Sequence, residues 1–251
     1  MIITETDTQI IVHKCSKCRS TNIVRNGHNQ AGNAQYKCLD CNAHRVLEPK
    51  TVSKESRAKI REMSLKAMLE RCSMRGVARI FQISRNTLLR WILSHYESLP
   101  FLEQTLLPAQ KDDVLELDEA WSFVLKKSQK RWIWTAICRR TRQIVAVVIG
   151  DRSEDTCQKL WDAIPQTYKS SFCYSDFWKA YQNVIPEEQY QAVGKETGET
   201  AHMERWYNTL RQWVGRLTRK TLSFSKNNDM HELFVKWFII EHNLRMRSSL
   251  S

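Results

Sequence analysis

The sequence is short of glycine and proline, which number 7 and 5 among 251 residues. Chains with a long disordered tract are usually rich in these residues, so their scarcity argues against one. No apolar run approaches the roughly 20 residues that span a bilayer. The first residues, MIITETDTQIIVHKC, lack the basic region and apolar stretch of a signal peptide. We therefore expect a cytoplasmic protein.

Acidic residues are in the minority. Lysine and arginine total 39 against 27 aspartates and glutamates, which gives a net charge of +12 and a pI near 9.4. The excess is uneven, with 17 basic against 8 acidic residues in 1–100 but 13 against 15 in 101–200. A solubilising surface and a nucleic-acid-binding protein with a metal-binding middle both fit this distribution. Charge alone leaves both open.

Four of the eight cysteines form a regular pattern. Cys15 and Cys18 make one C-x2-C pair, and Cys38 and Cys41 make another after 19 residues. Two such pairs present four thiolates tetrahedrally, which is typical of a closed structural zinc site. Disulfides are the alternative, but a cytoplasmic chain disfavours them. The spacer predicts short strands with a turn at Asn26-Gly27 and a loop at Gly32, so residues 1–50 are predicted to form a zinc ribbon.

Residues 51–98 have the pattern of a helix-turn-helix. The stretch 56–74 has apolar residues at near-helical spacing, and 76–81 predicts a second short helix. Ser84 is a good N-cap for a third helix that begins after a turn at Gln82-Ile83. An ordinary helical hairpin would have the same pattern. The residues predicted to face outward and contact DNA are Arg85, Asn86, Thr87 and Arg90.

Residues 99–111 contain prolines and are predicted to be a linker, and the pattern then changes at about residue 112. DVLELDEAWSFV, RWIWTAICR and QIVAVVIG predict consecutive strands, followed by alternating helices and short strands. From Ala201 a long helix is predicted through HMERWYNTLRQWVGRLTR. This order is that of a ribonuclease H-like domain of the retroviral integrase type over 112–251. The fold class is therefore multidomain α+β.

Three acids stand where that fold would bring them together. Asp118 lies in the first strand, Asp176 follows the strand SFCYS, and Glu204 lies in the first turn of the long helix, where Asn208 and Arg211 continue a polar stripe. Three clustered carboxylates repel one another unless a cation compensates them, and their oxygens suit Mg²⁺ or Mn²⁺. For any single acid taken alone, a solvated surface position is the better interpretation. Glu116 and Glu119 are predicted to support the site or the structure.

The chain resembles the DDE transposases of the insertion sequence 1 family. The resemblance rests on LELDEAW, on YSDFWKAY and above all on GKETGETAHMERWYNTLRQWVGRLTRKTLSFSK, with the cysteine pairs and helix-turn-helix upstream. It implies a catalytic triad of Asp118, Asp176 and Glu204 that binds two catalytic ions. It also implies cleavage at the ends of a mobile element and joining of the 3′ hydroxyls to target DNA.

Further expectations follow from this resemblance. His202, Arg205 and Asn208 lie in the matching stretch and are expected to be auxiliary residues. Glu196 and Glu199 are rivals of Glu204 for the third ligand, but their loop is a less rigid support than a helix. The expected partners are double-stranded DNA, as terminal inverted repeats and target, and further copies of this chain. A bacterial, nucleoid-associated location is also implied.

Two other functions remain open at this stage. A DNA-binding regulator would use the ribbon and the helix-turn-helix and carry an inactive catalytic fold. A ribonuclease H-like nuclease would cut DNA without joining it. Strand-transfer products distinguish a transposase from both.

Overall fold

The structure is a computed structural model that describes residues 2–6, 9–29, 32–46, 54–218 and 222–250. The chain divides into two compact units, Met1–Lys59 and Ile60–Ser251. Within the described ranges, no helix combines the length and the apolar character that crossing a bilayer requires.

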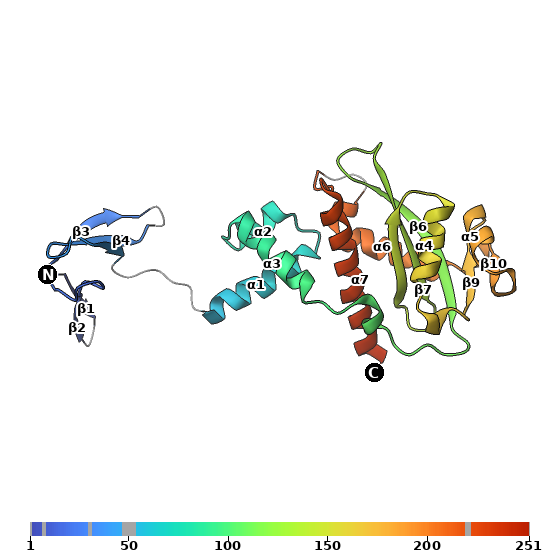
Figure 1. Ribbon diagram of the computed structural model, residues 1–251, viewed down its shortest axis with the longest axis horizontal. Helices are drawn as coiled ribbons and strands as arrows, with labels where there is room; N and C mark the ends of the chain where they lie inside the picture. The colour runs from blue at the N-terminus through green and yellow to red at the C-terminus, as the bar shows by residue number, and fades with distance from the viewer. Residues whose placement is uncertain (1, 7–8, 30–31, 47–53, 219–221, 251) are drawn as a thin grey trace. The chain divides into compact units, whose positions relative to one another are not determined.

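The first unit is built from short antiparallel strands. β3 (Ile23–His28), β4 (Ala34–Cys38) and β5 (His44–Val46) form one sheet in that order, and β1 (Ile3–Thr6) pairs with β2 (Gln9–Val12) in another (Figure 1). The small core of this unit consists of Ile2, Cys15, Ile23, Tyr36, Cys38 and Ala43. Two of its six members are predicted metal ligands, so the apolar core is small without them.

The predicted turn at Asn26-Gly27 is wrong. Both residues lie inside β3, where the register with β4 shifts between Arg25 and His28. Gly27 has φ +67°, so the dipeptide forms a bulge within the strand instead of ending it. The reversal comes at the predicted Gly32 loop, where Gly32 has φ +74° and its N–H donates to the carbonyl of Asn29 at 2.9 Å.

Three helices follow, α1 (Lys54–Met68), which contains the boundary between the units, α2 (Met74–Ile80) and α3 (Arg85–Glu97). The N–H of Gly76 donates to the Ser73 hydroxyl, and that of Thr87 donates to Ser84 at 3.0 Å, so both following helices begin at serine caps. Gln82 makes the turn between α2 and α3 with φ +52°. The helix predicted over 56–74 ends earlier, at Met68. That this helix pair is a DNA-binding helix-turn-helix stays a prediction.

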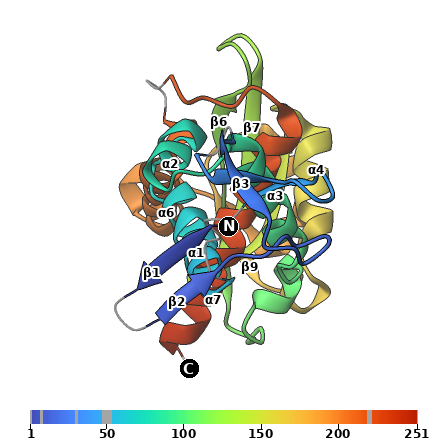
Figure 2. The same ribbon diagram turned by 90° about the vertical axis from the view of Figure 1, so that its left-hand side faces the viewer.

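The mixed α/β part has one central sheet with the strand order β10-β9-β6-β7-β8. β6 (Val114–Phe123), β7 (Lys130–Cys138) and β8 (Ile144–Gly150) are antiparallel, as the sequence predicts. β9 (Phe172–Ser175) runs parallel to β6, and β10 (Tyr190–Ala192) runs parallel to β9. β6 and β7 continue beyond the rest of the sheet as a projecting hairpin (Figures 1 and 2).

Helices cover both faces of this sheet (Figure 1). α4 (Glu154–Ala163) and α5 (Lys179–Val184) lie on one face, and α6 (Ala201–Trp213) and α7 (Asn228–Leu250) lie on the other. The alternation of β6 sends Leu115 and Leu117 into the core beneath α4 and α5. The core on the α6 and α7 side also contains Val77, Leu88 and Ile92, so α2 and α3 share a core with the helix that carries Glu204.

The helix predicted from Ala201 through Arg219 is shorter than expected. α6 ends at Trp213, and a single 3-10 turn, Gly215–Leu217, follows. The N–H of Arg71 donates to the Trp213 carbonyl at 2.8 Å, and a Cβ at position 215 would come within 2.8 Å of the Arg71 carbonyl oxygen. The approach of the α1–α2 connection therefore ends the helix and requires glycine at position 215.

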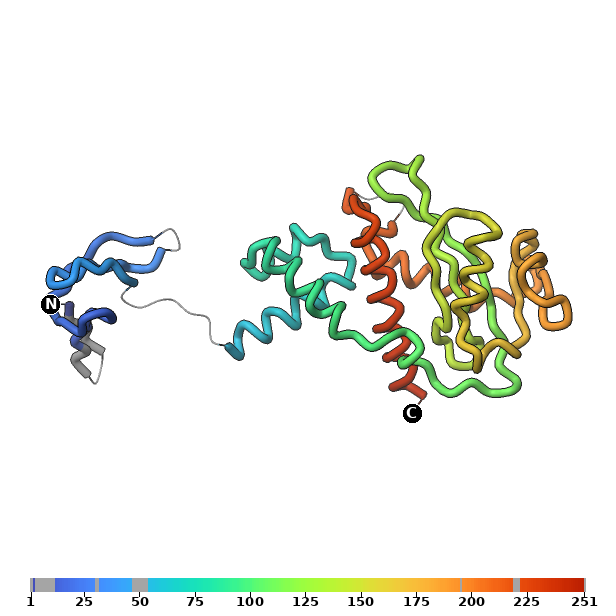
Figure 3. Tube along the Cα trace, in the orientation of Figure 1, coloured from blue at the N-terminus to red at the C-terminus, as the bar shows by residue number. Residues whose placement is uncertain are grey.

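The predicted linker, 99–111, is packed against the second unit along its path from α3 to β6 (Figure 3). Thr105 is fully buried in a 3-10 turn, Leu102–Thr105. Its carbonyl accepts from Gln143 at 2.9 Å and its hydroxyl accepts from Asn243 at 2.9 Å. Such a satisfied buried network fixes the segment in place, so it is not a flexible tether.

Candidate active site and metal centres

Three acids from separate elements line one cavity of about 390 Å³. Asp118 comes from the middle of β6, Asp176 from the residue directly after β9, and Glu204 from the first turn of α6. We call this space the acid cavity. Its lining residues are Leu117, Asp118, Glu119, Ala120, Trp132, Arg152, Asp176, Val193, Thr200, Glu204, Tyr207, Asn208 and Arg211. The parallel pairing of β6 and β9 brings the first two acids together, and α6 brings the third.

Backbone hydrogen bonds orient two of these carboxylates. The N–H of Glu119 donates to Asp118 Oδ1 at 2.8 Å, and the N–H of Trp178 donates to Asp176 Oδ1 at 3.0 Å. Tyr207, one turn after Glu204, places its hydroxyl 2.7 Å from the backbone carbonyl oxygen of Asp118. Because Tyr207 joins α6 directly to β6, it fixes Glu204 relative to Asp118. Burial raises the pKa of Tyr207 well above its usual value, so its hydroxyl stays protonated as a donor.

Glu116 fixes the start of α6. Its side chain is fully buried, and its Oε2 accepts from the backbone N–H groups of His202 and Met203, each at 3.1 Å. The Thr200 side chain makes no capping hydrogen bond in the described part of the chain, so a carboxylate from β6 caps the helix instead. Burial raises the pKa of Glu116, while a 2.9 Å ion pair with Arg139 opposes that rise. Glu116 is thus structural, one of the two roles expected for it.

Glu119 holds an arginine at the edge of the acid cavity. Its carboxylate pairs with Arg152 at 2.6 Å and accepts from the Tyr181 hydroxyl at 2.8 Å. The Arg152 guanidinium lies between two rings, 4.8 Å from the centroid of Trp132 and 4.1 Å from that of Trp178. Burial is the main cause that raises the pKa of Glu119. The result is a fixed cation beside the three acids.

Of the three predicted auxiliary residues, only one lies at the acid cavity. Among the described residues that line the acid cavity, Asn208 is present, while His202 and Arg205 are absent. His202 Nδ1 lies 2.5 Å from Glu116 Oε1, and Arg205 is exposed. The expected polar stripe is present, since Glu204, Asn208 and Arg211 all line the cavity.

The two rivals for the third ligand lie elsewhere. Glu199 pairs with Arg139 at 2.8 Å, and Glu196 folds back so closely on its own loop that a side chain at Gly194 would collide with its carboxylate. Neither carboxylate belongs to the described lining of the acid cavity. Glu204 is therefore the better placed candidate.

Sequence reasoning missed several lining residues. Arg152, Trp132 and Tyr207 were not predicted as part of the site, although Arg152 follows a strand end, where sites of α/β folds gather. In the sequence, Tyr207 stands at an apolar position of the predicted long helix, at helical spacing from Met203 and Leu210. Its hydroxyl lies 2.7 Å from Thr135 Oγ1 as well as near Asp118, and such long-range partners leave no local signal.

The acid cavity fits a hard divalent cation. Its candidate ligands are three carboxylates, and oxygen donors of this kind are what Mg²⁺ and Mn²⁺ prefer. The buried acids nearby are already compensated, Glu116 by Arg139 and Glu119 by Arg152. Asp118, Asp176 and Glu204 are therefore the candidate metal ligands among the acids of this region.

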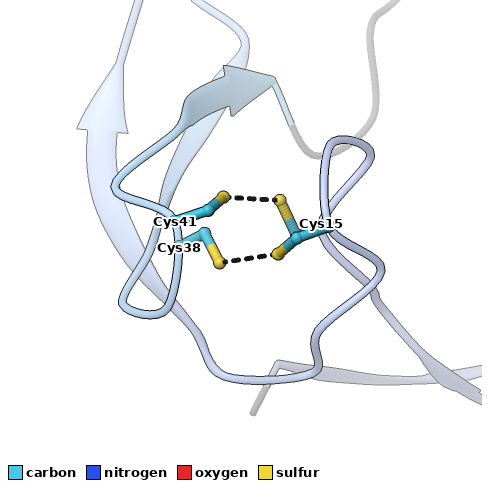
Figure 4. A group of neighbouring side chains, drawn as sticks. Cys15, Cys38 and Cys41 are labelled. Atoms are coloured by element: carbon cyan, nitrogen blue, oxygen red, sulfur yellow. Dashed lines mark hydrogen bonds between the residues drawn. The ribbon is translucent and has the colours of Figure 1, made fainter.

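The four predicted zinc ligands also lie together. Candidate ligand atoms of Cys15, Cys18, Cys38 and Cys41 all lie within 4.8 Å of one another. The sulfurs of Cys15 and Cys41 are 3.7 Å apart and those of Cys18 and Cys38 are 3.5 Å apart; the side chains point toward one another (Figure 4). A disulfide bond would place two sulfurs about 2.05 Å apart, much closer than either pair lies here. Zinc–sulfur bonds of about 2.3 Å in a tetrahedron require roughly the observed separations.

The charges of this cysteine cluster call for a cation. Backbone N–H groups, that of Cys18 foremost, lower the pKa of Cys15 to about 6. A hydrogen bond from the backbone at Ser20 lowers the pKa of Cys18. The Cys41 sulfur, burial and the other two cysteine sulfurs outweigh it and raise this pKa to about 12. One thiolate thus suppresses the ionisation of its neighbour. Zinc would relieve that repulsion, since it binds all four sulfurs as thiolates.

The predicted DNA-contacting residues lie at the start of α3. Arg85, Asn86 and Arg90 are exposed, whereas Thr87 is half-buried and its hydroxyl lies 2.8 Å from that of Ser84. Arg85 also lines a shallow cavity with Arg75 and Arg79 of α2. This surface is strongly basic. Its contact with DNA stays a prediction.

Comparison with known proteins agrees with this arrangement. The family model described as IS1 transposase matches residues 114–245. The insertion element iso-IS1n protein InsB of Shigella dysenteriae is 35% identical over 129 residues, 51% of this chain and 95% of that protein. The insertion element IS1 protein InsB of Shigella flexneri is 32% identical, and the IS1 4 protein InsB of Escherichia coli (strain K12) is 31% identical over 74% of its length.

Among solved structures, this chain is similar to the HTLV-2 integrase catalytic core domain in complex with magnesium (trimeric form). The match covers 53% of this chain and 97% of the integrase chain. Its TM-score is 0.26 and its sequence identity is 13%. The family match includes Asp118, Asp176 and Glu204 and covers just over half of the chain. The chain belongs to the IS1 transposase family.

Proposed function

We propose that this protein is a DNA transposase of the DDE type. It binds the terminal inverted repeats of an insertion sequence, cleaves at the element ends and joins the freed 3′ hydroxyls to target DNA. The observation that carries the proposal is the meeting of Asp118, Asp176 and Glu204 in one cavity. Family membership supports it, and so does the sheet order, in which β6, β7 and β8 are antiparallel and β9 and β10 run parallel to β6. That is the order expected of a ribonuclease H-like domain.

The three acids act as ligands. Two Mg²⁺ or Mn²⁺ ions, when bound, supply activation of the attacking oxygen and stabilisation of the leaving oxygen at a phosphodiester. Arg152 and Arg211 line the same cavity and attract the phosphate. Glu116 and Tyr207 hold α6 on β6, which keeps Glu204 in register with Asp118. Asn208 provides a neutral polar group beside the reacting phosphate.

The remaining modules bind DNA. Arg85, Asn86, Thr87 and Arg90 contact base edges and phosphates from the start of α3. The cluster of Cys15, Cys18, Cys38 and Cys41 holds structural Zn²⁺ and stabilises a ribbon that carries further basic residues. Joining requires two element ends and a target at once, so the active form is a homo-oligomer, a dimer or larger, on double-stranded DNA.

Strand transfer tests this proposal. The full chain is incubated with Mg²⁺, with DNA duplexes that carry the ends of its own element and with a supercoiled target plasmid. Asp118→Asn, Asp176→Asn and Glu204→Gln are compared with Asp112→Asn and Glu188→Gln, two exposed acids outside the described cavity lining. The wild type and both control variants are expected to join ends to the plasmid. The three cavity variants should bind the ends without joining them.

Other outcomes favour the two rival functions. Cleavage without joined products in the wild type would indicate a nuclease. Binding of the ends with neither cleavage nor joining would indicate a regulator with an inactive fold. Joining that survives Glu204→Gln would show that the third ligand lies elsewhere.

A further inference from the structure

The β6–β7 hairpin ends in a fully exposed basic tip. All six residues from Leu125 to Lys130 are exposed, and the segment, LKKSQK, carries three lysines. None of these lysines pairs with a carboxylate in the part of the chain that the structure describes. The tip contributes little to the core, since all of its six residues are exposed. Its cluster of uncompensated positive charge therefore suggests a role in binding.

A second segment runs beside the hairpin. The N–H of Leu125 donates to the carbonyl of Ser225 at 2.8 Å, and Val124 forms a parallel bridge with Ser225. Arg131 Nε donates to the side chain of Asn228, the first residue of α7, at 3.1 Å. Residues 225–228 are thus attached along one edge of the hairpin, although about 100 residues separate the two segments in sequence.

The two segments enclose a cavity of about 590 Å³, which we call the hairpin groove. Its lining includes three cations, Lys130, Arg131 and Lys226, and one acid, Asp151. The Asp151 carboxylate accepts from the hydroxyls of Ser153 at 2.5 Å and Thr156 at 2.6 Å, at the start of α4. These hydrogen bonds already stabilise the negative charge of Asp151. With three cations against this one acid, the groove is positive overall.

The hairpin groove adjoins the acid cavity. Trp132 lines both spaces, and its ring is one of the two that hold Arg152 at the edge of the acid cavity. Lys130 and Arg131 directly precede Trp132 in β7, and both line the groove with it. If the reacting phosphate of a polyanion lies in the acid cavity, the part of the polyanion that extends out of the cavity would therefore lie along successive positive charges.

We propose that the hairpin groove binds the phosphate backbone of a DNA strand that runs out of the acid cavity. This inference rests on the proposed transposase function and names a surface for its substrate. Lys130, Arg131 and Lys226 neutralise phosphates next to the reacting one, and the tip lysines Lys126 and Lys127 continue the contact. This surface does not include α3, so it is a DNA contact separate from the predicted recognition helix.

Salt dependence of DNA binding tests the inference. Binding of the full chain to labelled duplexes is measured from 50 to 300 mM salt for the wild type, Lys130→Gln/Lys226→Gln and the matched control Lys111→Gln/Lys159→Gln. The control removes the same charge from exposed lysines outside the described lining of the groove. Each phosphate contact contributes about 0.9 to the slope of log affinity against log salt. The groove variant should lower the slope by about 1 to 2, and the control should leave it unchanged.

The DNA itself is varied to identify the strand. A lower slope only on duplexes with the element's ends would assign the groove to the end, and a lower slope on unrelated duplexes as well would assign it to any backbone, including target. An unchanged slope, or an equal fall in the control, overturns the inference. Because this readout is binding, it stays informative if the wild type joins no ends. In that case the proposed transposase function is wrong, but the salt dependence of binding still tests whether the hairpin groove contacts DNA.

Discussion

The two units of this chain differ in what holds them together. The described part of Met1–Lys59 has a small core of six side chains, in which Cys15 and Cys38 are among the most buried. Ile60–Ser251 has two large apolar cores, one on each face of its sheet. We therefore expect the first unit to need a metal bound at its cysteine cluster in order to fold, because so small an apolar core rarely suffices.

The same contrast extends to the metal ligands. Four sulfurs converge in the first unit, where a closed tetrahedral site leaves no position for a substrate. Three carboxylates line an accessible cavity in the second unit, in a fold already stabilised by apolar packing. We therefore expect metal removal to unfold the first unit but to leave the second folded and inactive.

Zinc removal should have the largest effect. Structural zinc contributes about 10 kcal/mol or more to folding in small zinc modules, so chelation or Cys38→Ser should unfold Met1–Lys59. Amide hydrogen exchange of β3 and β4 checks this. All nine tryptophans lie after Lys59, so their fluorescence should stay unchanged. If the amides of β3 and β4 stay protected from exchange after chelation, the first unit folds without zinc. The two units would then not differ in their need for a metal.

Glu116→Ala should destabilise the second unit substantially. The change removes a buried carboxylate that caps α6 and pairs with Arg139, and losing one partner of a buried pair costs about 3 to 5 kcal/mol. Denaturation followed by tryptophan fluorescence measures the loss. Glu116→Gln keeps an acceptor for the N–H groups of His202 and Met203, so its loss should be smaller. Equal stability of the alanine variant and the wild type would show that the cap is dispensable.

Acid should destabilise the second unit through His231. Burial lowers the pKa of this histidine to about 4, and its Nδ1 lies 3.0 Å from the Ser225 hydroxyl oxygen. The unfolded chain therefore binds the proton more readily, so stability is lost as the pH falls from about 6.5 to 4, by about 3 kcal/mol in all. Denaturation at several pH values should show this slope, and His231→Gln should flatten it. The same slope in both proteins would assign the acid sensitivity to other groups.

The smallest effect concerns the α3 cap. Ser84→Ala removes the acceptor for the N–H of Thr87 and should cost about 1 kcal/mol. Ser84→Asn should restore most of the loss, because asparagine also caps helices well. Tryptophan-monitored denaturation distinguishes the two variants. An alanine variant as stable as the asparagine variant would mean that packing of Leu88 and Ile92 alone determines where α3 lies.

Local patterns predicted much of this fold. The alternation in β6–β8 and the C-x2-C pairs depend on neighbours in sequence, and both appear in the structure. The turn at Asn26-Gly27 was wrong because the same dipeptide also suits a bulge. The end of α6 at Trp213 depends on Arg71, more than 100 residues away, so no local signal marks it.

The site shows the same limit. Asp118 could be predicted from its place within a strand, Asp176 from a strand end and Glu204 from a helix start, and the three acids line one cavity. The partners of Glu116 and Glu119 could not, because Arg139, Arg152 and Tyr181 reach them across the fold. Which acids form ion pairs with arginines therefore required the structure.

Manganese binding tests the central claim most directly. Free Mn²⁺ is measured by electron paramagnetic resonance during titration of the zinc-loaded full chain, with Asp118→Asn, Asp176→Asn, Glu204→Gln and the control Asp112→Asn. We expect the wild type and the control to bind Mn²⁺, and the cavity variants to lose binding while zinc content and tryptophan-monitored stability persist. Cavity variants that bind Mn²⁺ as the wild type does would contradict the assignment of these three acids as catalytic metal ligands.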